Sequence, residues 1–160
     1  MTEKVYITPG GARVLRDELN HIWKVKRPEI TSKVSAAAAL GDRSENADYI
    51  YGKKALREID KRIRYLTKQL DNLEIVDRIP DDQNRVFFGA WITLLNDANE
   101  EKTVRIVGAD EFDLNKGWIS LHSPMAKALL GKRLDDEVTI ETPGGKEQYE
   151  LVKITYGDPS

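Results

Sequence analysis

The chain has 160 residues, of which 40% are hydrophobic and 32% charged, with no cysteine and a formal net charge of −2. The absence of cysteine excludes disulfide bonds and thiolate metal sites, and it favours the reducing cytoplasm. No apolar run approaches the roughly 18 residues of a membrane span, and the first residues lack the apolar stretch of a signal peptide. We therefore expect a soluble, cytoplasmic protein that does not interact with a membrane.

The net charge hides a difference between the two halves of the chain. Residues 1–78 carry 16 Lys and Arg against 12 Asp and Glu, whereas residues 79–160 carry 9 against 15. Such a shift indicates a domain boundary, and the segment 79–84 has the composition of a linker. We expect a helical domain at residues 1–78, a linker at 79–84 and a second domain at 85–160. The basic first domain could approach nucleic acid or an acidic protein surface.

Helical periodicity dominates the first domain. Apolar residues recur at steps of three and four from about residue 11 to Leu40, where Pro28 predicts a kink or a loosened turn, and again from about Asn46 to Val76. The apolar seam of the second stretch has heptad spacing and consists of Leu56, Ile59, Ile63, Leu66, Leu70 and Leu73. Two such helices, each roughly 45 Å long at 1.5 Å per residue, predict an antiparallel coiled-coil hairpin.

A short acidic turn joins the two predicted helices. Gly41 suits the left-handed backbone just past a helix end, and Asp42, Ser44 and Asn46 are all good N-cap residues. Asp42 with Glu45 three residues later fits a capping box, which needs no further role. The same two carboxylates, at the far end of the hairpin, could instead supply part of a weak Mg²⁺ shell that a partner completes. The two roles do not exclude each other.

The second helix also has a face of one charge sign. At 100° per residue, six basic side chains lie within roughly 100° of each other, about opposite the seam. These six residues, called the basic face below, are Lys53, Lys54, Arg57, Lys61, Arg64 and Lys68. A charged face is usually only solvated, but a face of one sign next to an acidic turn favours contact with a phosphate backbone.

After residue 84 the pattern changes to short β-like runs. They cover residues 86–95, 103–107, 118–121, 138–142 and 149–156, with a turn at 143–146 and one short helix at 124–130 that Ser123 caps. This arrangement predicts an α+β fold, a small antiparallel sheet packed with one helix. No nucleophile–base pair, Gly-rich phosphate loop or metal-ligand cluster occurs in the sequence, so we expect no self-contained active site.

Several segments closely resemble the bacterial Gre transcript-cleavage factors. The resemblance is carried by residues 41–49, 53–54 and 56–60 and continues through 27–29, 86–91, 105–108 and 123–130, so it spans nearly the whole chain. Arg43-Ser44 and the run 64–68 look like the B type of the family. The resemblance implies a helical stalk followed by a globular domain similar in fold to FK506-binding proteins (FKBP-like).

The resemblance also implies a function. Family members act as transcription elongation factors: the globular domain docks at the rim of the RNA polymerase secondary channel, and the stalk brings its tip to the active centre. There, carboxylates that match Asp42 and Glu45 help to hold a second Mg²⁺, and the polymerase hydrolyses backtracked RNA. The family's basic patch, which matches the basic face, contacts the nascent RNA 3′ segment. The chain is expected to act as a monomer and to have no enzymatic activity of its own.

The chain departs from the family pattern at two positions, Ala55 and His122, the second of which bears on docking. A helix that begins at Ser123-Pro124 presents unpaired N–H groups to an acidic partner. We therefore expect His122, Ser123, Pro124 and Met125 to form the edge that docks on the polymerase rim. The alternative is that Ser123 only caps a short core helix while His122 points to solvent.

Two other functions fit parts of the sequence. An inhibitor of the same architecture would enter the channel and block it, but such a plug needs no paired acids at its tip. A peptidyl-prolyl isomerase or chaperone would use the second domain, but it would leave the acidic turn unexplained. Cleavage stimulation accounts for more of the chain than either.

Overall fold

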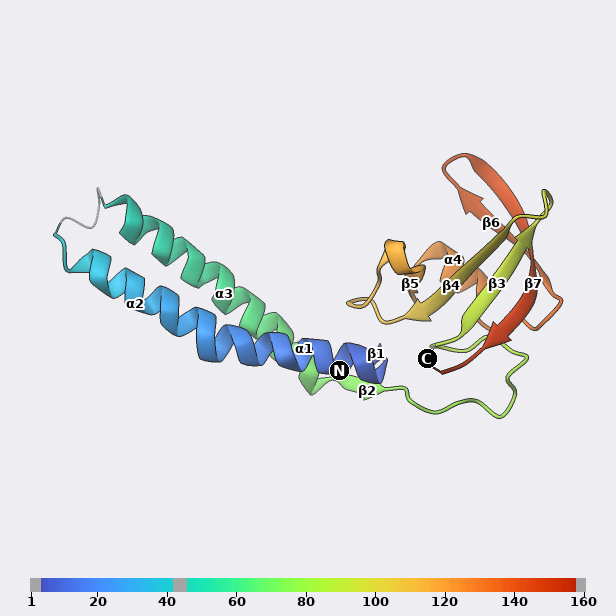
Figure 1. The fold of residues 1–160 in the computed structure, drawn as a ribbon, viewed down its shortest axis with the longest axis horizontal. Coiled ribbons are helices and arrows are strands. Elements are labelled where there is room, and N and C mark those ends of the chain that lie inside the picture. The colour runs from blue at the N-terminus through green and yellow to red at the C-terminus, as the bar shows by residue number, and fades with distance from the viewer. Residues whose placement is uncertain (1–3, 42–45, 158–160) are drawn as a thin grey trace. The chain divides into compact units, whose positions relative to one another are not determined.

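A computed structural model describes residues 4–41 and 46–157 (Figure 1). Its helical part consists of α1 (Pro9–His21), a π-helical segment (Ile22–Lys26), α2 (Arg27–Ala38) and α3 (Ala47–Asp71). Helices α2 and α3 lie side by side, which confirms the predicted hairpin. Residues Ala12–Leu73 form one compact unit. No helix in the described ranges is both long and apolar enough to span a membrane.

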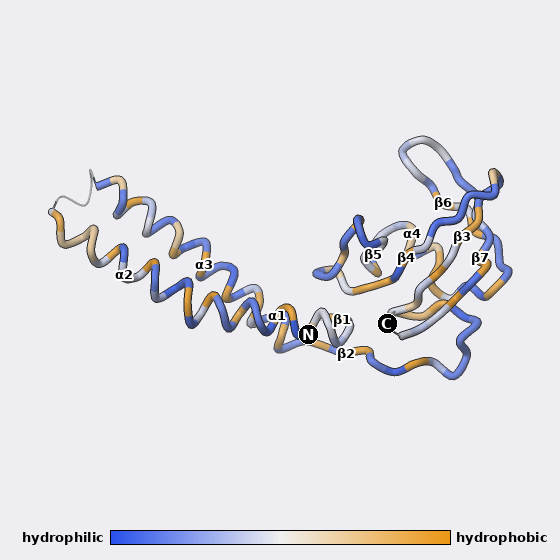
Figure 2. Tube along the Cα trace, viewed as in Figure 1, coloured by the Kyte–Doolittle hydropathy of each residue, from blue (hydrophilic) through white to orange (hydrophobic). Residues whose placement is uncertain are grey.

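The hairpin has a narrow core, because each helix can bury only the side that faces the other. Hydrophobic and hydrophilic residues alternate along both helices (Figure 2). Leu66 in the α3 seam is completely buried, and the side chains of Ile22 and Ala37 are almost completely buried. Leu56, Ile59 and the rest of the seam are half-buried. Much of the hairpin surface is therefore open to other contacts.

The loosened turn predicted at Pro28 lies just before that residue. The backbone N–H of Arg27 donates to the carbonyl of Ile22, five residues earlier, in the π-helical segment. Pro28, in the first turn of α2, has no N–H to continue an α-helical ladder. The helical path therefore widens for one turn and then resumes.

Helix α3 is shorter than its seam predicts. It ends at Asp71, and the following residues form β2 (Leu73–Ile75), which pairs with β1 (Val5–Ile7). The Asn72 side chain donates to the Lys68 carbonyl at 2.8 Å, which occupies one of the free carbonyls at the helix end. The predicted helix to Val76 was therefore several residues too long.

The second unit contains a five-stranded sheet in the order β5-β4-β3-β7-β6. Its elements are β3 (Trp91–Asn96), β4 (Glu101–Val107), a 3₁₀ turn (Leu114–Lys116), β5 (Trp118–Ser120), α4 (Pro124–Leu129), β6 (Glu137–Thr142) and β7 (Gly145–Thr155). The α+β fold is confirmed, with one difference: β4 and β5 run parallel, so the sheet is mixed. Alternate residues such as Ile92 and Leu94 are fully buried in its core, together with Leu129 of α4.

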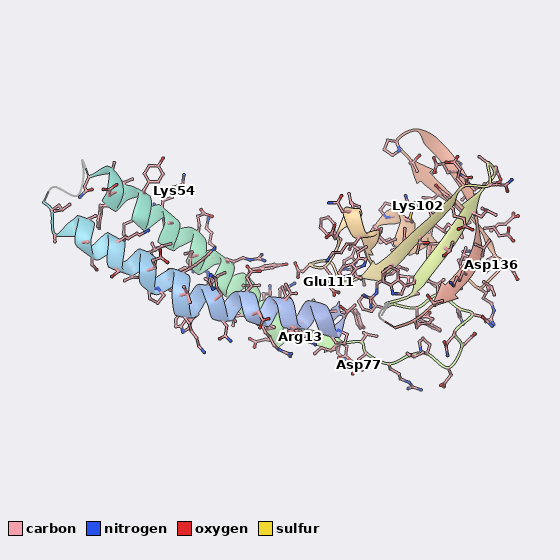
Figure 3. The ribbon with its side chains drawn as sticks, in the orientation of Figure 1. Arg13, Lys54, Asp77, Lys102, Glu111 and Asp136 are labelled. Carbon is pink, nitrogen blue, oxygen red and sulfur yellow. The ribbon has the colours of Figure 1, made fainter. Side chains whose placement is uncertain are left out.

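The N-terminal segment Val5–Gly11 belongs to this second unit. The buried Glu111 carboxylate accepts hydrogen bonds from the backbone N–H of Thr8 (3.1 Å), the Thr8 hydroxyl and the backbone N–H of Gly108 (2.7 Å). Thr8 in turn accepts a bond from the Gly11 N–H, at the start of α1. Glu111 (labelled in Figure 3) thus attaches the start of the chain to the sheet unit.

Candidate nucleic-acid interface

The two helix ends at the acidic turn are stabilised by residues on either side of it. Gly41 has a φ of +124°, the left-handed region expected of a glycine after a helix end. Asn46 is the N-cap of α3: its Oδ1 accepts from the Tyr49 N–H at 3.2 Å. Its Nδ2 donates to the Ala37 carbonyl at 2.7 Å, across to α2. Asn46 therefore performs the capping that the sequence also offered to Asp42.

The two candidate metal ligands, Asp42 and Glu45, lie outside the described residues. Among residues 4–41 and 46–157, no group of three or more His, Asp and Glu side chains is arranged to hold a metal ion. The prediction of a tip site therefore depends on the sequence and on the position of the turn between α2 and α3.

All six residues of the basic face are exposed on α3. Lys54 is labelled in Figure 3, where it projects from α3 away from α2. None of the six side chains forms an ion pair or a hydrogen bond with another residue in the part of the chain that the structure describes. Arg62, by contrast, makes two bonds to Glu18, of 2.6 and 2.8 Å. The basic face is therefore available to an external polyanion.

An ion pair borders the basic face. Arg27 Nε lies 2.9 Å from Asp60 Oδ1 and joins α2 to α3. The hydrogen bond from Arg27 holds the pKa of Asp60 below its ordinary value of 3.8, and the same bond raises the pKa of Arg27. Asp60 is therefore ionised at neutral pH, and its charge is balanced mainly by Arg27 of α2, with a smaller attraction to Arg64 of the basic face.

Sequence reasoning missed the surface of α2 next to this ion pair. Trp23 is 57% exposed although its neighbour Ile22 is buried, and the Arg27 guanidinium carbon lies 5.8 Å from its ring centroid. An open groove of about 530 Å³ begins at these two residues and continues along α2 past Pro28, Thr31, Ser32 and Ser35. In the sequence, the signal that could have pointed to this surface was a large aromatic residue within a helical pattern.

All four residues of the docking edge predicted in the second unit lie within the described part of the structure. Ser123 is the N-cap of α4 and accepts from the Ala126 N–H at 3.2 Å. His122 and Pro124 are exposed, while Met125 is half-buried against the sheet core. The capping role of Ser123 is confirmed, and the role of the four residues in docking stays a prediction.

Two family models match the chain. The model described as "Transcription elongation factor, N-terminal" covers residues 5–75, and "Transcription elongation factor, GreA/GreB, C-term" covers residues 81–156. The transcription elongation factor GreB of Pasteurella multocida is 59% identical over 98% of this chain and 99% of its own. GreB of Haemophilus ducreyi is 54% identical over 100% and 99%. Among solved structures, the transcription factor Gfh1 aligns with 96% of this chain and 99% of its own, at 25% identity and a TM-score of 0.47.

The chain therefore belongs to the GreA/GreB family of transcription elongation factors. Within that family its similarity to the two GreB proteins supports the B type, which confirms the resemblance found in the sequence.

Proposed function

We propose that the protein binds RNA polymerase through its secondary channel and stimulates the polymerase to hydrolyse the 3′ end of backtracked nascent RNA. The observation that carries this proposal is the basic face, which follows directly after an acidic turn. It consists of six exposed cations that form no ion pair or hydrogen bond within the residues that the structure describes. The cations would contact phosphates of the RNA, and the turn would reach the reacting phosphodiester. The protein would supply no active site of its own.

The carboxylates of the turn fit a shared Mg²⁺ ion by their chemistry. Mg²⁺ prefers oxygen ligands, and it is often held by one or two carboxylates while the remaining positions are taken by water or substrate. Asp42 and Glu45 would be these ligands, and the polymerase would complete the shell. The ion, when bound, would stabilise negative charge during phosphodiester hydrolysis.

The capping geometry supports a role for these two acids beyond helix stability. Asn46 already provides the N-cap of α3, so neutral variants at Asp42 and Glu45 should leave the hairpin folded. Loss of activity in these variants would then reflect chemistry at the tip.

The test uses a stalled, backtracked elongation complex with Mg²⁺, to which the parent protein, Asp42→Asn or Glu45→Gln is added. We expect the parent to shorten the RNA from its 3′ end and both variants to lose this activity while they still compete with the parent for polymerase. Full cleavage by both variants would refute the tip mechanism. Stalled synthesis without any cleavage by the parent would identify a channel inhibitor instead.

We further propose that His122, Ser123, Pro124 and Met125 contact the polymerase rim. His122 and Pro124 offer an exposed edge, and the exposed part of Met125 adds an apolar contact. Competition binding of His122→Asp and Met125→Glu tests this edge, with circular dichroism as the control for folding. If folded Met125→Glu competes as well as the parent, docking occurs elsewhere on the second unit.

A further inference from the structure

We infer that Trp23 is a stacking platform for one unpaired base of a single-stranded RNA whose phosphates lie on the basic face. The groove formed by Trp23, Arg27, Pro28, Thr31, Ser32 and Ser35 is called the Trp23 groove below. This inference rests on the proposed function in that it assigns a second contact to the same RNA strand. It concerns the π-helical segment and α2, which the tip mechanism and the basic face do not use.

The position of Trp23 favours a ligand over a packing role. Trp23 lies in the π-helical segment and is more than half exposed, so it contributes little to the hairpin core. π-Helical turns occur frequently at functional sites, where the extra residue per turn redirects side chains. The indole ring is already ordered on one side by the Arg27 guanidinium, which limits the entropy lost when a ligand stacks on it.

The Trp23 groove and the basic face lie on the same flank of the hairpin. With Asp60 as the origin and 100° per residue, the six basic side chains on α3 fall between about 20° and 120°. Asp60 therefore borders that face, and its attraction to Arg64 agrees with this position. Because Asp60 bonds to Arg27, which lines the groove, the two surfaces meet at this ion pair. A strand bound along the basic face passes the groove.

The chemistry inside the groove differs from that around it. Residues 20–35 carry four Lys and Arg against one Glu, so the surroundings attract an anion. Within the groove the only charged group is Arg27, which Asp60 already pairs. The other groups are an indole, a proline ring and three hydroxyls, of which Thr31 donates to the Arg27 carbonyl and keeps its oxygen as an acceptor.

A neutral aromatic groove beside a row of cations suits single-stranded nucleic acid. In such complexes the cations follow the phosphates, and aromatic side chains stack on the bases. An acidic peptide would need free cations where its carboxylates lie, and the groove has none. The structure therefore favours a nucleobase in this groove, with its polar edge toward the hydroxyls of Thr31, Ser32 and Ser35.

The experiment measures binding of the full chain to two single-stranded RNA oligonucleotides of equal length, one with bases and one abasic. We expect Trp23→Leu to weaken binding of the base-bearing strand roughly 5- to 150-fold, the range for loss of one base–aromatic stack. Binding of the abasic strand and the salt dependence should stay unchanged, because the phosphate contacts remain. Trp23→Phe should retain most of the affinity. Tyr51→Leu is the matched control, since Tyr51 is 77% exposed on α3 and does not line the groove.

Three results would overturn the inference. The first is a parent protein that does not distinguish the two strands or binds neither of them. The second is a folded Trp23→Leu variant that binds the base-bearing strand as tightly as the parent. The third is an equal loss of affinity for RNA and for polyglutamate, which would assign the groove to an acidic protein surface. Since no polymerase is present, these results are independent of the cleavage assay.

Discussion

At the scale of single residues, Asn46 combines two functions that are usually separate. Its side-chain oxygen Oδ1 caps α3, and its side-chain nitrogen Nδ2 donates to the Ala37 carbonyl at the end of α2. One side chain therefore satisfies a free N–H at the start of one helix and a free carbonyl at the end of the other. It connects the helix ends on either side of the acidic turn.

We expect Asn46→Ala to lower the free energy of unfolding by about 1 kcal/mol or slightly more, since an N-cap and a second bond are lost. Asn46→Asp keeps the capping oxygen but loses the donor to Ala37, so it should fall between the parent and the alanine variant. Urea unfolding followed by circular dichroism measures the difference. Equal stability of parent and alanine variant would mean that water replaces both bonds.

The Arg27–Asp60 pair predicts a pH dependence whose sign follows from the shifted pKa. Because the pKa of Asp60 is lowered in the folded protein, its ionised form stabilises the hairpin at pH values above the ordinary pKa of 3.8. That contribution is lost as the pH falls through the lower, folded-state pKa. The stability difference between parent and Asp60→Asn should therefore be constant from neutral pH to about 4 and shrink below it. A difference that persists unchanged at lower pH would contradict the assigned pKa shift.

Single residues also show what the sequence can and cannot predict. The basic face follows from spacing along one helix, so sequence alone was enough to predict its exposed residues. Asn46 was one of three acceptable caps, and local rules could not choose among them. The bonds that Glu111 accepts from Thr8 join residues 103 positions apart, a contact that no local pattern encodes.

At the scale of elements, a glycine sets how closely α2 and α3 approach each other near the turn. A Cβ added to Gly52 would lie 2.4 Å from Cγ2 of Val34, closer than carbon atoms can pack. Sequence analysis did not single out Gly52. In a helix interior, glycine costs about 1 kcal/mol relative to alanine, so close packing against Val34 offsets that cost.

We expect Gly52→Ala to destabilise the hairpin by about 1 kcal/mol, since overpacking typically costs about 1–3 kcal/mol and the helix propensity of alanine returns about 1. In a Val34→Ala background the clash is removed, so the same substitution should become neutral or stabilising. A double-mutant cycle of thermal melts measures this coupling. Additive effects of the two substitutions would show that the helices move apart freely.

Element boundaries were harder to predict than element types. The seam continues through Leu73, yet α3 ends at Asp71 because the next residues pair with β1. Periodicity could not show this, since Leu73 and Ile75 suit a strand as well as a helix. The parallel pairing of β5 with β4 was missed for a similar reason, because it depends on the path of the connection between them.

At the scale of the whole molecule, binding and chemistry are assigned to different parts of the chain. The proposed polymerase contact lies in the second unit, and the proposed metal ligands lie in the turn. The proposed RNA contacts lie on the π-helical segment, α2 and α3. Each contact can therefore be removed without the others. The substrate dependence of each loss then identifies the part that caused it.

The basic face provides the clearest test of whether one contact can be removed without the others. Replacing Lys53, Lys54, Arg57 and Lys61 with glutamine removes four exposed cations that have no partner in the described residues, so the hairpin should stay folded. Each lost phosphate contact lowers the salt dependence of RNA binding by roughly 0.7 in the log–log slope. We therefore expect cleavage of RNA backtracked by many nucleotides to fall much more than cleavage after one or two steps, because only the longer extruded strand reaches along α3.

The matched control removes the same number of cations from the second unit, at Lys102, Lys132, Lys146 and Lys153, all of which are exposed. With this variant the polymerase should cleave both substrates as it does with the parent, since the variant keeps every cation of the hairpin. Cleavage rates on the two substrates at several salt concentrations distinguish local RNA contacts from a general loss of positive charge. If the hairpin variant loses both substrates equally while it still binds polymerase, the basic face does not follow the extruded RNA and must act at the active centre itself.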